Sequence, residues 1–177
     1  MGKTDQASRM EQSRNITRIG CMGLALLFIL LILIGGIAVR ADVQKLKTKA
    51  LGDLGKMRTQ IDKVPGILGR MVEFGCGEDA RLAEENVSGI IESLESDAGF
   101  DRLEQVWDEI DDAYDLLYDG CRKYQYERAF DDLKTEMEGV RNRYSVEKGN
   151  YRKSSEAYNA ALGNFPADFF AFDFEQL

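Results

Sequence analysis

The stretch IGCMGLALLFILLILIGGIAV, residues 19–39, contains no charged side chain. Twenty-one helical residues rise about 31 Å, which matches the hydrocarbon thickness of a bilayer. A cleaved signal peptide has a shorter apolar core and a small-x-small cleavage site, whereas Arg40 directly follows this run. We therefore expect a retained transmembrane helix. Its members include Ile19, Leu24, Leu27, Phe28, Leu31, Ile34 and Val39.

The flanks of this helix say little about its orientation. Lys and Arg are nearly as frequent before the span as after it, with a small excess after it. By the positive-inside rule, that excess favours a cytoplasmic C-terminal domain. Lipid attachment is not expected, because the most apolar part of the stretch, Gly23–Ile34, follows Cys21 instead of preceding it as in a lipoprotein signal, and because Gly2 lacks the Ser or Thr that myristoylation requires.

The composition of the 177 residues excludes several classes of protein. Lys and Arg number 23 against 31 Asp and Glu, a net charge of −8, so no basic face is expected for nucleic acid. The chain has no histidine, the commonest general base and metal ligand. The sequence offers no catalytic constellation, resident metal site or cofactor motif. We expect a protein that is not an enzyme and has no cofactor.

The cysteines are too few for a disulfide framework. Cys76 and Cys121 pair only if their domain faces an oxidising space. The alternative, which we favour on the sequence, is that both are free, buried thiols.

After residue 40, apolar residues recur at steps of three and four, the pattern of amphipathic helices. The first helix continues to Ile61 and is interrupted at Val64-Pro65-Gly66. A second stretch, 65–94, has a weak point at Gly75-Cys76-Gly77, which is either a kink or a short break. A third starts at Phe100 and ends at Asp119-Gly120, where glycine suits a left-handed cap.

The fourth helix has the clearest pattern, because its large side chains recur at an interval of seven. They are Phe130, Met137, Tyr144, Tyr151, Tyr158 and Phe165. Such spacing predicts a coiled-coil-like core seam. Four amphipathic helices joined by short links can bury their apolar sides together in an antiparallel bundle. We therefore expect an all-α fold with a polar tail (1–18), a transmembrane helix (19–39), a four-helix bundle (40–166) and a C-terminal tail (167–177).

An up-down-up-down order brings the end of the fourth helix back towards the bilayer. Residues 165–174 include five phenylalanines in ten positions. One interpretation is that these rings pack under the end of the bundle. The other is that they make shallow contact with the lipid interface.

Charge is segregated along the chain. Residues 1–72 carry 12 basic and 5 acidic side chains, and residues 78–138 carry 6 basic and 20 acidic ones. The acidic cluster of the third helix comprises Asp108, Asp111, Asp112, Asp115 and Asp119. It is either a solvated face that keeps the domain soluble or a docking surface for a basic partner or for cations.

The C-terminal half resembles a known family. The segment Phe130-x-x-Leu133-x-x-x-Met137-Glu138-Gly139-x-x-Asn142-Arg143 is similar to a signature of the LemA family, as are Tyr151 with Tyr158-Asn159 and Phe165-Pro166. The stretch Ile61–Glu73 resembles that family's motif around its own proline. Departures include Arg152, where the family usually has Asn, and a heavier acidic load on the third helix. The resemblance implies a bacterial membrane-anchored helical bundle without an established reaction.

These observations predict a membrane-anchored, non-enzymatic scaffold whose partners are the lipid bilayer and another protein. The alternative, which the resemblance implies because some relatives of that family are associated with magnetosome membranes, is a magnetosome-type or other organelle or metal-handling membrane protein that uses its acidic face for divalent or ferric cations. In both cases the protein is a single-pass membrane protein, in the bacterial cell membrane or in the magnetosome membrane.

Overall fold

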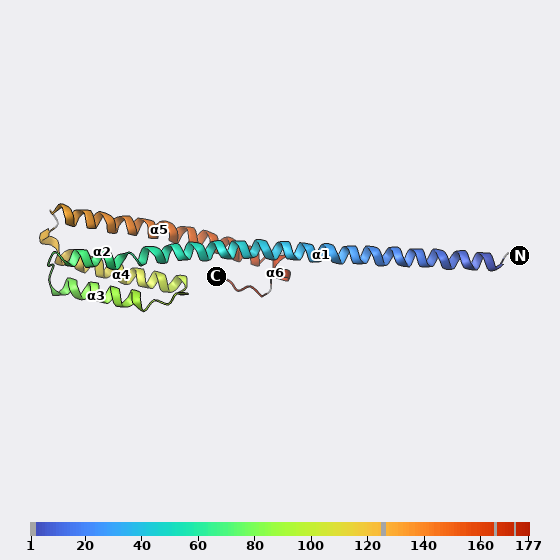
Figure 1. Ribbon diagram of the computed structural model, residues 1–177, viewed down its shortest axis with the longest axis horizontal. Coiled ribbons are helices and arrows are strands. Elements are labelled where there is room, and N and C mark those ends of the chain that lie inside the picture. The colour runs from blue at the N-terminus through green and yellow to red at the C-terminus, as the bar shows by residue number, and fades with distance from the viewer. Residues whose placement is uncertain (1–2, 125–126, 165, 172) are drawn as a thin grey trace. The chain divides into compact units, whose positions relative to one another are not determined.

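The computed structural model describes residues 3–124, 127–164, 166–171 and 173–177, and of residues 3–22, 168 and 169 only the backbone. All regular structure in these residues is helical, as the all-α expectation required (Figure 1). The elements are α1 (Lys3–Ile61), α2 (Val64–Val72), α3 (Glu78–Glu92), α4 (Phe100–Gly120), the 3-10 turn η1 (Arg122–Tyr124), α5 (Arg128–Leu162) and α6 (Ala167–Phe170). The chain divides into two compact units: unit 1 is residues 1–45 with 158–177, and unit 2 is residues 46–157.

In unit 1, α1 carries the apolar stretch, and the protein leaves it uncovered. The large apolar side chains from Leu24 to Ile37 are between 42% and 71% exposed. Almost none of this stretch is buried within the protein. The helix is therefore long and apolar enough to cross a membrane. The side chain of Ile19 lies outside the described side chains.

In unit 2, the proline after α1 starts a helix without reversing the chain. Pro65 stands in the first turn of α2, where a missing backbone N–H leaves no hydrogen bond unmade. Ser154 of α5 hydrogen-bonds to Asp53 of α1, and Glu136 of α5 pairs with Arg70 of α2 at 2.8 Å. As the chain advances through α1 and α2, its partner residue moves back along α5. Both helices therefore run antiparallel to α5.

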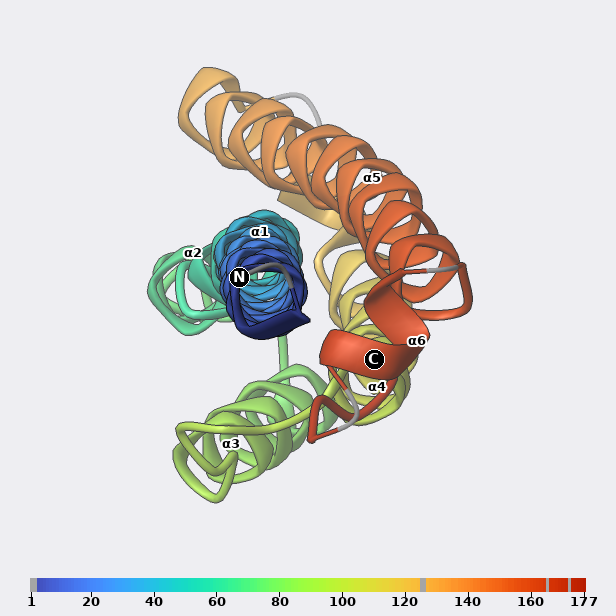
Figure 2. The ribbon, with the colours of Figure 1, turned by 90° about the vertical axis from the view of Figure 1, so that its right-hand side faces the viewer.

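The chain first reverses between α2 and α3. Gly75 and Gly77 have φ values of 76° and 100°, which only glycine adopts without strain. Of the two interpretations of residues 75–77, a kink or a short break, the break is confirmed, and α2 and α3 are separate helices rather than one helix of the bundle. Local sequence marks a break at both places but not the direction that the chain takes afterwards. Figure 2 shows α2, α3, α4 and α5 end-on, and buried residues of each of them join those of the second half of α1 in one core.

The seam of α5 supplies much of that interior. Phe130, Met137, Tyr144 and Tyr151 are at most 6% exposed. In unit 1, Tyr158 is fully buried, whereas Phe165 lies outside the described residues. The remaining buried side chains of unit 2 come from every helix. They include Met57, Ile61, Ile67, Leu68, Met71, Val87, Leu103, Val106, Ile110 and Leu117.

An aromatic stack joins α4 to α5. The rings of Trp107 and Tyr144 are nearly parallel, with their centroids 3.9 Å apart. The Tyr144 hydroxyl donates a hydrogen bond to the Leu103 carbonyl oxygen at 3.2 Å. Burial raises the pKa of Tyr144. Because its proton is held in this hydrogen bond and its ring is buried, we assign Tyr144 a structural role.

Truncating the seam should cost more stability than truncating the opposite face of the same helix. We expect Met137→Ala to lower the free energy of unfolding by about 2–5 kcal/mol, because a fully buried side chain leaves a cavity. The matched control Val146→Ala removes a side chain that is 60% exposed and should change it by less than about 0.5 kcal/mol. Urea unfolding of the full chain in detergent, followed by circular dichroism, measures both. Equal effects of the two substitutions on the free energy of unfolding would contradict the prediction that the seam side chains form the core.

Candidate functional site

The acidic side chains of α4 form one stripe along the helix. Its core side is apolar and includes Leu103, Val106, Ile110 and Leu117. Asp108, Asp112, Asp115 and Asp119 follow at steps of four, three and four, which places them on one face of a helix. All four are exposed, and Asp111 at the edge of the stripe is partly buried. Here we call these five aspartates the acidic face.

One edge of the acidic face is neutralised by α5. Arg141 Nη2 lies 2.9 Å from Asp111 Oδ1 and 4.0 Å from Asp115 Oδ1. The same guanidinium lies over the ring of Tyr114, 5.4 Å from its centroid. Burial raises the pKa of Tyr114 to about 12, and Arg141 partly opposes this shift. Further along the same edge, Lys148 and Arg152 both pair with Glu104. These contacts align α4 with α5.

The middle of the acidic face has no such neutralisation. Within the part of the chain that the structure describes, Asp108 and Asp112 have no ion-pair partner. Asp119 pairs with Arg122 at 3.1 Å, but both side chains are at least 70% exposed, and such pairs contribute little. Asp108 and Asp112 therefore leave negative charge available to a partner.

A shallow groove of about 360 Å³ lies between α3 and α4, next to this unpaired charge. Its lining from α3 is Ala83, Asn86, Val87 and Ile90, and from α4 it is Glu109, Asp112, Ala113 and Leu116. Leu116 is apolar but 64% exposed, and it directly follows Asp115 of the acidic face. The groove thus combines an apolar lining with carboxylates at its edge.

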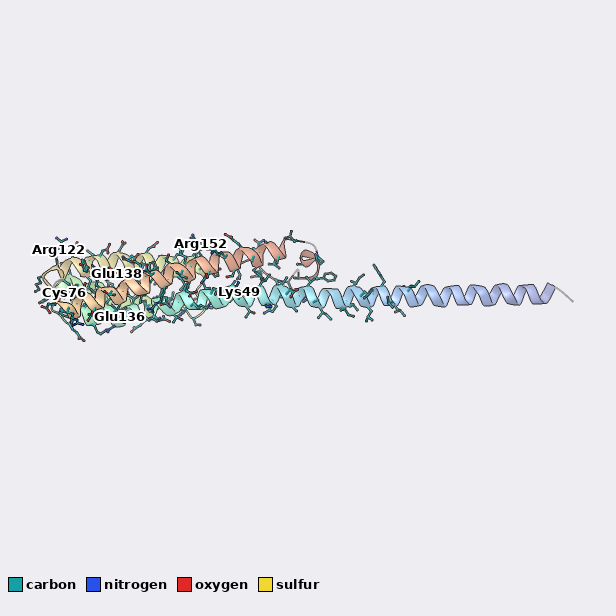
Figure 3. The ribbon with its side chains drawn as sticks, turned by 90° about the horizontal axis from the view of Figure 1, so that it is seen from above. Lys49, Cys76, Arg122, Glu136, Glu138 and Arg152 are labelled. Atoms are coloured by element: carbon teal, nitrogen blue, oxygen red, sulfur yellow. A yellow bond between two sulfur atoms is a disulfide. The ribbon has the colours of Figure 1, made fainter. Side chains whose placement is uncertain are left out.

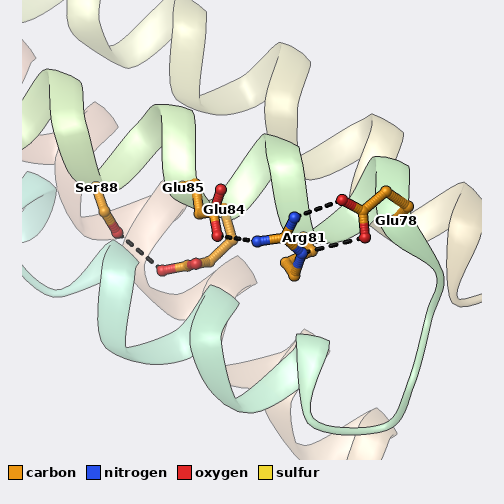
Figure 4. A network of polar contacts seen from close by, with 5 residues as sticks. All are labelled: Glu78, Arg81, Glu84, Glu85 and Ser88. Atoms are coloured by element: carbon orange, nitrogen blue, oxygen red, sulfur yellow. Dashed lines mark hydrogen bonds and ion pairs between the residues drawn. The ribbon is translucent and has the colours of Figure 1, made fainter.

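Three acidic side chains on α3, Glu78, Glu84 and Glu85, are used differently, because they bind partners within their own helix. Arg81 pairs with both Glu78 and Glu85, and Ser88 donates to Glu84 at 2.8 Å (Figure 4). The hydrogen bond from Arg81 lowers the pKa of Glu78. Unpaired charge beside the groove therefore comes from α4.

Cys76 and Cys121 form a disulfide, so the expectation of two free thiols is wrong. Their Cα atoms are 4.5 Å apart, and both residues are buried. Cys76 lies near the same end of unit 2 as Arg122 (Figure 3). The bond closes a loop of 45 residues, and the entropy it removes from the unfolded chain raises that chain's free energy by about 4 kcal/mol in the chain-entropy model. It holds the α2–α3 turn to the end of α4.

Gly120 is required by this junction rather than by a left-handed cap. Among the described residues, only Gly75 and Gly77 have positive φ. A Cβ atom on Gly120 would lie 3.1 Å from the Cys76 carbonyl oxygen. Glycine at this position lets the two backbones approach closely enough for the disulfide.

The sequence places the five aspartates on one helix but does not predict which of them form ion pairs with basic side chains of other helices. Arg141 belongs to another helix 30 residues away, so its pairing with Asp111 depends on the bundle. The groove was also missed. Leu116 is the available signal, because it is an apolar residue on the polar side of an otherwise regular amphipathic pattern.

A count of free thiols tests the disulfide directly. Cells are quenched in acid, denatured, and treated with a maleimide that adds visible mass. We expect one labelled cysteine per chain, Cys21, out of the three present, and three after reduction. The Cys21→Ser variant should give none before reduction and two after it. Three labelled cysteines without reduction would contradict the bond.

Comparisons of the chain with protein-family models, with curated proteins and with solved structures find no match.

Proposed function

We propose that this protein is a membrane-anchored, non-enzymatic scaffold of the LemA type that binds a basic partner segment on the acidic face of α4. The observation that carries the proposal is the unpaired charge of Asp108 and Asp112 next to an apolar groove. A partner helix with an apolar stripe and flanking Lys or Arg fits both features, because the groove receives the apolar side chains and the carboxylates receive the cations.

The anchor in this proposal is residues 19–39 of α1. Each apolar side chain left in water costs free energy in proportion to its exposed area, about 25 cal/mol per Å². The protein leaves more than half of the surface of Leu24, Phe28 and Ile37 uncovered. Hydrocarbon lipid is the environment in which such a helix is stable, since its backbone hydrogen bonds are all satisfied internally.

The LemA assignment rests on the order and spacing of sequence motifs. The segment from Phe130 to Arg143 carries the strongest of these motifs, and the stretch Ile61–Glu73 carries a second. In unit 2 the motif residues Phe130, Leu133 and Met137 are buried on one side of α5, which gives a physical reason for their spacing.

A scaffold is favoured over an enzyme by the chemistry of the side chains. The chain has no histidine to act as a general base. Cation handling has no specific observation in its favour. In the described ranges, three or more Cys, Asp or Glu side chains nowhere come together to hold a metal ion.

We further propose that unit 2 faces an oxidising compartment, in place of the cytoplasmic side that the small excess of positive charge favours. Structural disulfides persist in the periplasm or outside the cell and are rare where thiols are kept reduced. The nearly equal numbers of Lys and Arg on the two sides of the span oppose this orientation only weakly. The thiol count in quenched cells reports on this orientation as well.

The partner site is tested by reversing the unpaired charges. Tagged full-length protein is cross-linked in its native membranes, purified, and its captured proteins are quantified by mass spectrometry. We expect Asp108→Lys with Asp112→Lys to lower the capture of at least one basic protein about tenfold or more, because two attractions become repulsions. The same capture should weaken at high salt, which screens exposed charges.

The matched control is Glu92→Lys with Glu156→Lys, which makes the same change in net charge at exposed positions of α3 and α5. This variant should capture the partner as the unaltered protein does. If both double variants capture the same proteins in the same amounts, the acidic face is only a solvated surface and the proposal fails.

A further inference from the structure

The C-terminal segment is fastened to α1 through Arg40. Within unit 1, Arg40 Nη1 donates to the Phe170 carbonyl oxygen at 3.1 Å, and Arg40 Nη2 pairs with Asp173 Oδ2 at 2.7 Å. The guanidinium also lies 5.6 Å from the centroid of the Phe174 ring. Arg40 is the first charged residue after the apolar stretch. The segment is therefore attached where that stretch ends.

Phe170 lies directly against the last turn of the apolar stretch. A Cβ atom on Gly36 would be 2.7 Å from Phe170 Cδ1, so the ring occupies the space beside this glycine. Gly36 is buried, while Gly35 and Ile37 on either side are exposed. The glycine thus provides a flat place on α1 for the ring.

The far end of the segment is attached to the end of α5. The Tyr158 hydroxyl donates to the Glu175 carbonyl oxygen at 2.7 Å. The Asn159 side chain makes two hydrogen bonds with the backbone of Leu177, at 2.8 and 3.0 Å. Residues 166–171 and 173–177 are thus held at Arg40 and at the last turns of α5, by Tyr158 and Asn159, all within unit 1.

The position of Phe170 along α1 sets its depth in a membrane. Gly36 comes three residues before Val39, the last residue of the span, so it lies about 4–5 Å inside the hydrocarbon edge at 1.5 Å per residue. Arg40 lies just beyond that edge. A ring beside Gly36 is then at the boundary between acyl chains and headgroups, the depth at which amphipathic segments bind.

The charge of Asp173 does not oppose a position of the Phe170 and Phe174 rings at the membrane boundary. A bare carboxylate near hydrocarbon is costly, but Asp173 is paired with a guanidinium that itself lies at the boundary. The hydrogen bond from Arg40 holds the pKa of Asp173 below its usual value. The rings of Phe170 and Phe174 are both only partly buried by the protein.

We propose that residues 166–171 with 173 and 174 form an interfacial membrane-contact element, in which Phe170 and Phe174 enter the acyl-headgroup boundary beside the span and Arg40 with Asp173 stays at the polar surface. The proposal rests on the membrane anchoring proposed above. It names the lipid surface as the binding partner of a segment that lies outside the acidic face.

Fluorescence quenching in vesicles tests this placement. The full chain is reconstituted into phosphatidylcholine vesicles with and without lipids brominated near the headgroup end of the acyl chains. Trp107 is the one natural tryptophan, and it gives the baseline. In Phe174→Trp, brominated lipid should lower the emission by roughly a third or more, because one of the two indoles then reaches the interface. Phe170→Trp, the second placement, should be quenched at least as strongly.

The matched control is Val146→Trp, an exposed position on α5 in unit 2, which should show the unaltered protein's response to brominated lipid. Circular dichroism checks that each variant keeps its helical content. If the protein floats with the vesicles but neither Phe174→Trp nor Phe170→Trp is quenched beyond the control, the interfacial element is disproved and the anchor stands. If the protein does not float with the vesicles, the anchor fails, and this proposal fails with it.

Discussion

An apolar helical surface that the protein does not cover is the constraint on which the rest of the structure depends. From Leu24 to Ile37 the large side chains of α1 are mostly exposed, and nothing charged interrupts them. Such a surface is stable in lipid and costly in water. With the proposed anchoring, the bilayer would complete the apolar packing in unit 1, whereas unit 2 buries its own apolar side chains.

Unit 2 satisfies the same hydrophobic requirement by internal packing. The α5 seam supplies large side chains at an interval of seven, and the facing helices α1 and α2 run antiparallel to it. Ion pairs between α4 and α5 add alignment at the surface, as Arg141 shows with Asp111. The disulfide adds a covalent link at one end. Because packing and alignment use the inner side and one edge of α4, its outer side remains available for binding.

The sequence predicts those features that depend on local pattern. The uncharged stretch, the α5 seam and the helical class all follow from residue periodicity and composition. Features that depend on distant residues could not be predicted. A break at Pro65 looks like a reversal until α2 is seen to run with α1, and the pairing of Cys76 with Cys121 joins residues 45 positions apart. The neutralisation of Asp111 by Arg141, and the lack of such a partner for Asp108 among the described residues, likewise depend on how α5 lies against α4.

Extraction of isolated membranes with alkaline carbonate distinguishes the two kinds of attachment, because it strips proteins held by charge and leaves those that cross the bilayer. We expect the full chain to stay in the membrane pellet, and a variant with Leu27, Leu31 and Ile34 each changed to Lys to move to the supernatant. Release of the unaltered chain into the supernatant would contradict a transmembrane anchor.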